Sequence, residues 1–93
     1  MKFYFLAITY NFDGDCFTKT FNTKDEAIKS MNEYLENEIK EVMQKSGYKP
    51  SVLNWSEDDV TLVYAEGYSL ENLADGKFRL EDCADYRVFE VEV

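Results

Sequence analysis

Carboxylates are the most numerous side chains of this sequence that could act in acid–base chemistry or bind a cation. The 93 residues include 19 Asp and Glu, 10 Lys and Arg, two Cys and no His. Without His, the sequence has no Ser-His-Asp or Cys-His arrangement to activate a nucleophile and no His-containing zinc site. Its four glycines form neither of the Gly-rich patterns that cradle phosphates. We therefore expect a protein without catalytic residues, cofactor or metal.

The acidic residues are concentrated in the second half of the chain. Residues 1–50 hold eight acidic and seven basic residues, a net charge of −1, whereas residues 51–93 hold eleven and three, a net charge of −8. Within that half, the stretch WSEDDV (residues 55–60) places three consecutive carboxylates between two apolar runs. Such a stretch is typical of a solvated turn. Adjacent carboxylates in so acidic a chain do not indicate a catalytic pair, which needs a defined separation across a cleft.

The stretch NFDGDC (residues 11–16) has oxygen ligands spaced like the start of a calcium loop. The EF-hand pattern then requires Gly at its sixth position and Glu at its twelfth, where this sequence has Cys16 and Asn22. A hairpin turn is therefore the better interpretation.

Aromatic residues interleaved with the acids favour a protein-binding surface. Trp55 borders the acidic stretch, and Tyr64, Tyr68 and Tyr86 lie among the later carboxylates. Aromatic side chains within a charged surface are typical of protein interfaces, and a negative field attracts a basic partner. We predict a small acidic, non-catalytic protein-binding module whose contact residues are Trp55, Glu57, Asp58, Asp59, Tyr68, Asp75, Glu81, Asp82, Asp85, Glu90 and Glu92.

In an alternative interpretation, the same carboxylates imitate phosphates. In size and charge, though not in any motif, the chain resembles small acidic inhibitors of host nucleases from phages and mobile elements. The resemblance implies that residues 57–59 and 75–92 would occupy the basic groove of a nucleic-acid-binding protein. The net charge of −9 argues against direct binding to nucleic acid or to an anionic membrane, because both need Lys and Arg.

A strand hairpin at the start of the chain is the first element expected to position these residues. Residues 2–12 are apolar on both faces, which predicts a strand inside its sheet or one with a covered face. Asp13-Gly14 favours a two-residue turn, and a second strand is predicted over residues 16–21.

One long amphipathic helix is predicted to follow, beginning at Thr23. Thr23 and Glu26 form a capping box, and apolar residues recur at helical spacing from Ile28 to Val42. Gly47 and Pro50 then end the helix.

Three more strands are predicted, over residues 51–55, 60–65 and 86–93, with a helical turn from Ser69 and a further turn at Asp75-Gly76. The element order is strand-strand-helix-strand-strand-short helix-strand. It predicts a single α+β domain over residues 1–93, an antiparallel β-sheet with the long helix packed on one face.

The N-terminal apolar run is short, which indicates a cytoplasmic protein. The apolar run over residues 3–8 is too short to be the hydrophobic region of a signal peptide. No apolar stretch reaches the ~20 residues of a membrane span. Cys16 and Cys83 are expected to be unbridged and buried, although the sequence is also compatible with one bridge between them. A third interpretation is a homodimer, in which the doubly apolar first strand pairs or packs against a second copy.

Overall fold

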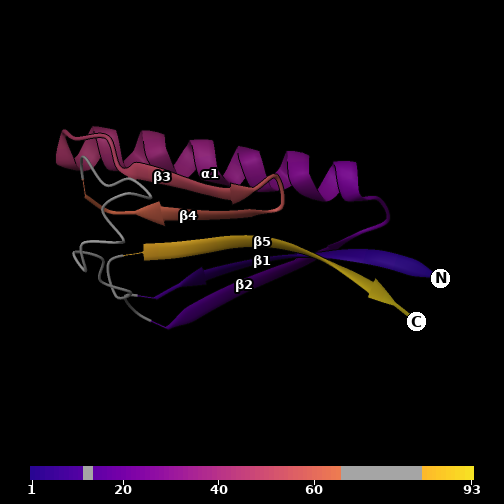
Figure 1. Ribbon diagram of the computed structural model, residues 1–93. Coiled ribbons are helices and arrows are strands. Elements are labelled where there is room, and N and C mark those ends of the chain that lie inside the picture. The colour runs from indigo at the N-terminus through magenta and orange to yellow at the C-terminus, as the bar shows by residue number, and fades with distance from the viewer. Residues whose placement is uncertain (12–13, 66–82) are drawn as a thin grey trace.

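The computed structural model describes residues 1–11, 14–65 and 83–93, and within them the chain forms a five-stranded antiparallel sheet with one long helix on one face (Figure 1). The order across the sheet is β2-β1-β5-β4-β3. The predicted α+β architecture is therefore confirmed. The elements are β1 (Lys2–Tyr10), β2 (Asp15–Phe21), α1 (Lys24–Ser46), β3 (Ser51–Ser56), β4 (Asp59–Val63) and β5 (Cys83–Glu92).

The first hairpin has the predicted strands but a longer connection. β1 lies inside the sheet between β2 and β5, as its two apolar faces predict. The last pair of the hairpin is Tyr10 with Asp15, so four residues rather than two join the strands. Gly14 has φ +76° and donates its N–H to the Tyr10 carbonyl at 2.9 Å, while the N–H of Asn11 bonds to Cys83 of β5 at 3.0 Å. Asn11 is thus held by β5 instead of extending the hairpin.

The last strand in the chain occupies the middle of the sheet. β5 pairs with β1 from Lys2–Glu92 to Tyr10–Ala84 and with β4 on its other side. It begins three residues before the predicted start at residue 86. The additional residues are paired as well, since Ala84 lies opposite Leu62 and Cys83 opposite Val63.

Helix α1 begins and ends where the capping residues predict. Thr23 has extended backbone angles, and its hydroxyl accepts a hydrogen bond from the N–H of Glu26 at 3.2 Å. Gly47 has φ 72° and donates to the Met43 carbonyl at 3.1 Å. This left-handed conformation is easily reached by glycine alone, so the helix stops there.

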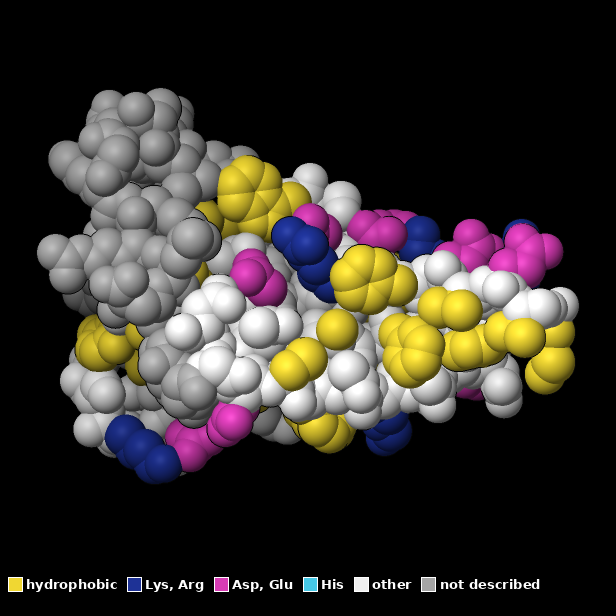
Figure 2. Space-filling view, turned by 90° about the horizontal axis from the view of Figure 1, so that it is seen from below, with side chains coloured by type: hydrophobic (Ala, Val, Ile, Leu, Met, Phe, Trp, Pro, Cys, Tyr) yellow, Lys and Arg dark blue, Asp and Glu magenta, His cyan; other side chains and the backbone are white. Residues whose placement is uncertain are grey.

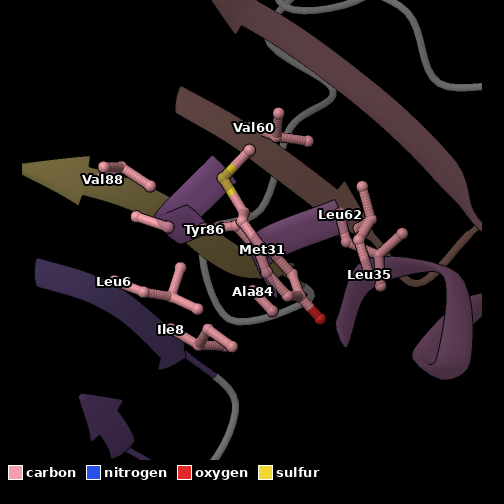
Figure 3. Close-up of a cluster of buried hydrophobic side chains, with 10 residues drawn as sticks. Leu6, Ile8, Met31, Leu35, Val60, Leu62, Ala84, Tyr86 and Val88 are labelled. Carbon is pink, nitrogen blue, oxygen red and sulfur yellow. The ribbon is translucent and has the colours of Figure 1, made fainter. Parts of the chain in front are cut away.

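The hydrophobic core lies between α1 and the three inner strands (Figure 3). Met31 and Leu35 of the helix point onto side chains that alternate along the strands. Burial of these side chains supplies most of the free energy that fixes the helix on the sheet. The buried strand residues of this cluster are Leu6 and Ile8 of β1, Val60 and Leu62 of β4, and Ala84, Tyr86 and Val88 of β5.

No disulfide joins the two cysteines. Cys83 is buried, as expected, but Cys16 is exposed because it lies on β2, the strand at the margin of the sheet. The predicted helical turn from Ser69 and the turn at Asp75-Gly76 fall outside the described residues.

Candidate functional site

The sheet has two faces of different character. Alternate residues of β1, β4 and β5 point toward α1 and form the core, and the residues between them point to the opposite side, which we call the second face. Figure 2 views this side and shows hydrophobic side chains in a row across the half of it nearer the chain termini. Acidic and basic side chains follow one margin of the row.

The row is built by two neighbouring strands. Phe3 lies opposite Val91 and Phe5 opposite Phe89, so four apolar side chains share one face of β1 and β5; we call them the aromatic strip. The rings of Phe3 and Phe5 meet edge to face, with their centroids 5.3 Å apart. Phe89 is 46% exposed, whereas the core side chains behind it are buried. Phe3, Phe5 and Val91 are partly buried, so the strip is an apolar surface that solvent reaches mainly at Phe89.

Beside the strip, a hydrogen-bonded network crosses three elements. The Asp85 carboxylate accepts one bond from the Thr61 hydroxyl at 2.7 Å and another from the Asn11 amide at 3.0 Å. The Thr61 hydroxyl accepts in turn from the indole N–H of Trp55 at 2.8 Å. Thr61 is only 3% exposed, so its hydroxyl depends on these partners rather than on water. Both carboxylate oxygens of Asp85 are engaged, which makes it a structural acceptor.

An ion pair separates the network from the strip. Arg87 of β5 lies opposite Asp59 of β4, and its Nε contacts the Asp59 carboxylate at 3.2 Å. A depression of about 170 Å³ opens beside it, lined by Ala7, Thr9, Asp85, Arg87 and Phe89. Ligand pockets of enzymes and carriers are typically ~300–1,000 Å³, so this one has room for a single side chain of a partner.

The acidic stretch WSEDDV forms the tight turn between β3 and β4. Lys24, at the start of α1, contacts Glu57 at 3.2 Å and Asp58 at 3.7 Å, and the hydrogen bond to Glu57 raises the pKa of the lysine. The Ser56 hydroxyl donates to Asp58 at 2.6 Å; this bond and the nearby Lys24 charge lower the pKa of that carboxyl. With Asp59 paired to Arg87, the three carboxylates and two cations leave a local net charge of −1.

The predicted contact residues do not all share one surface. Trp55, Asp59 and Asp85 belong to the second face, and Glu57 and Asp58 lie in the β3–β4 turn. Glu90 and Glu92 alternate to the side of β5 that carries Val88, and Glu90 contacts Lys2 at 3.2 Å. The remaining predicted residues lie outside the described part of the chain: Tyr68, Asp75, Glu81 and Asp82.

Two tyrosines that the sequence interpretation grouped with the acids belong to the helix side instead. Tyr86 is fully buried in the core, and the Tyr64 hydroxyl donates to Glu38 of α1 at 3.0 Å. Burial raises the pKa of both phenols, so they stay protonated. For Tyr86, the alternation with Asp85 and Arg87 along the chain could have signalled this placement, because neighbouring strand residues point to opposite faces.

The aromatic strip was absent from the predicted contact residues. Two features of the sequence could have indicated it: the Lys2–Phe12 segment is apolar on both faces, and Phe89 and Val91 alternate with acidic residues. A single helix covers only one face of a sheet, so the apolar side chains on the other face needed another partner. The prediction of contact residues was instead based on the negative charge of residues 51–93.

Within residues 1–11, 14–65 and 83–93, no group of three or more Cys, Asp and Glu side chains is arranged to hold a metal ion. In the same part of the chain, no helix is long and apolar enough to cross a membrane. Comparison of the chain with protein-family models, curated proteins and solved structures found no match.

Proposed function

We propose that the protein is a non-catalytic binding module that contacts another protein through the aromatic strip. The observation that carries the proposal is the exposed Phe89 side chain, which lies beside the partly buried Phe5 on the face of the sheet that α1 does not cover. Exposed apolar patches with a polar margin are typical of protein-binding surfaces, and aromatic residues dominate their binding energy.

The margin of the strip indicates the chemistry of the partner. Arg87 and Asp59 remain about half and one-third exposed, so each can exchange its ion pair for a contact across an interface. The chain as a whole has a net charge of −9. A partner with apolar side chains surrounded by Lys and Arg would be attracted by this field and would fit the strip.

Affinity capture with matched variants tests this function. Wild type, Phe89→Asp and Met43→Asp are used as baits in a lysate of the source organism, and captured proteins are quantified by mass spectrometry. Met43 is 47% exposed and lies on α1, so it controls for adding a charge at an equally exposed apolar position. We expect one partner to be captured by wild type and Met43→Asp and lost with Phe89→Asp. Equal capture by all three would overturn the role of the strip.

The alternative of nucleic-acid mimicry is supported by the net charge and by the eleven acids of the second half. The ion pairs of Glu57, Asp58 and Asp59 with Lys24 and Arg87 weaken the case for the β3–β4 turn as its centre. The discriminating variant replaces all three carboxylates with Lys. Under mimicry, capture of a nucleic-acid-binding protein is lost with this variant and falls steeply with salt in wild type.

A further inference from the structure

We propose that the protein forms a homodimer in which β2 pairs, antiparallel, with β2 of a second copy. In the described part of the chain, β2 ends the sheet on one side (Figure 1), and its residues from Asp15 to Thr20 are all exposed. A strand in this position presents a row of backbone donors and acceptors that another strand can use. The pairing would join two five-stranded sheets into one.

The two margins of the sheet differ in how well they resist such pairing. β3, at the other margin, follows Pro50 and has a register shift between Asn54 and Ser56, and both features disfavour the addition of a strand. β2 runs in continuous register with β1 over seven residues and contains no proline. Of the two, β2 is the margin that can accept a strand.

Lysine is a residue that edge strands carry to prevent pairing with another strand, and β2 has one, Lys19. β2 also carries a residue of opposite charge, Asp15. When Phe17 lies opposite Phe17 of a second copy, antiparallel pairing places Lys19 opposite Asp15 of that copy. The two-fold axis generates this opposite-charge pair twice. The same register puts Cys16 opposite Thr18. Moving the axis to Thr18 would place Lys19 opposite Phe17 and lose both ion pairs, so charge selects the first register.

The Phe17 side chains would meet on the helix side of the joined sheet. Phe17 is 39% exposed, and its ring packs against Tyr34 of α1, with the centroids 5.2 Å apart. A second Phe17 across the axis would cover the remaining surface of each ring. Directly opposite aromatic pairs are among the stabilising pairs of antiparallel sheets.

The distribution of charge also favours this edge. Two copies with a net charge of −9 each repel one another, but Asp15 and Lys19 leave β2 itself neutral. Approach through β2 keeps the acidic β3–β4 turns at the far margins of the joined sheet. Strand pairing over a few residues is a small interface, so we expect dissociation in the micromolar range.

Sedimentation equilibrium of the full chain, over a range of concentrations at fixed salt, tests the proposal. Lys19→Asp and Asp15→Lys each replace two attractive pairs with two repulsive ones, and each should weaken association at least about tenfold. The double exchange restores opposite charges and should restore association. Lys29→Asp makes the same change in net charge as Lys19→Asp, at an exposed position of α1, and should leave association unchanged. Far-UV circular dichroism verifies that each variant is folded.

Cross-linking then tests the register. Thr18→Cys, in a Cys83→Ser background, places a thiol opposite Cys16 of the second copy, and oxidised glutathione should convert the pair to a disulfide-linked dimer while glutathione is reduced. Thr20→Cys in the same background shifts the thiol by two residues and should cross-link much less.

A monomer at all concentrations would overturn the proposal. So would a dimer whose association is unchanged in the Lys19→Asp and Asp15→Lys variants, or one that cross-links better through Thr20→Cys than through Thr18→Cys. Phe89→Asp should not affect this dimer. Loss of association with Phe89→Asp alone would place self-association on the aromatic strip and refute pairing through β2.

Discussion

The Asp85 network should contribute more to stability than any surface ion pair among the described residues. Asp85→Ala removes the acceptor of two side-chain hydrogen bonds, from Thr61 and Asn11, and leaves the buried Thr61 hydroxyl without its acceptor. Hydrogen bonds to a charged group are worth ~1.5–3 kcal/mol each, and Asp85 is only partly buried, so we expect a loss of about 2–4 kcal/mol. For a domain of this size, each kcal/mol lowers Tm by ~4–8 °C.

A double-mutant cycle isolates the bond between Thr61 and Asp85. Thr61→Val keeps the shape of the side chain and removes its hydroxyl, and the indole N–H of half-exposed Trp55 can then bind water. We expect this variant to lose about 1–2 kcal/mol and the pair to show a coupling of at least about 1 kcal/mol. Urea unfolding followed by far-UV circular dichroism measures the free energy of unfolding of wild type, of each single variant and of the double variant.

The exposed Arg87–Asp59 pair is the matched control for the cycle. It lies on the same face and also joins β4 to β5, but its side chains are 52% and 31% exposed. Asp59→Ala should cost no more than ~1 kcal/mol, because exposed ion pairs contribute little. A Thr61–Asp85 coupling below ~0.5 kcal/mol, or an Asp85→Ala loss no larger than that of Asp59→Ala, would refute the structural role assigned to Asp85.

Three further predictions concern stability. The buried Tyr86 hydroxyl has no partner at hydrogen-bond geometry among the described residues, although the nearby Tyr10 phenol contributes to its raised pKa. An unsatisfied buried group costs ~1–3 kcal/mol, so Tyr86→Phe should raise Tm or leave it unchanged, and a clear decrease would show that the contact with Tyr10 is a stabilising hydrogen bond. Met31→Ala removes a fully buried helix side chain and should cost ~2–5 kcal/mol in urea unfolding, with a loss below 1 kcal/mol contradicting the packing of α1 on the sheet. The lowered pKa of Asp58 stabilises the fold above its unfolded value of 3.8, and this contribution disappears as the pH falls through the lower folded-state pKa. Ser56→Ala should therefore be less stable than wild type at neutral pH and converge with it in acid, whereas a pH-independent difference would contradict the hydrogen bond.

Local patterns were sufficient to predict most elements of the fold. Thr23, Glu26 and Gly47 determine where α1 begins and ends, because caps act on backbone groups within a few residues of themselves. The apolar run over residues 2–12 and the alternation along residues 86–93 predicted two strands, and neighbouring strand residues point to opposite faces. These features depend on near neighbours in the chain, which a sequence displays directly.

The tertiary structure decided which residues meet. β5 enters the sheet between β1 and β4, and only this position brings Asp85 to Asn11, 74 residues away, and to Thr61, 24 residues away. It also turns Tyr86 into the core and sets Phe89 beside Phe5 on the face opposite α1. Charge counted along the chain could not reveal that Lys24 lies against the acidic turn. The sequence by itself thus determined the elements and the total charge. The pairing of distant strands, whose energy comes from contacts that no local pattern encodes, decided which side chains form a surface.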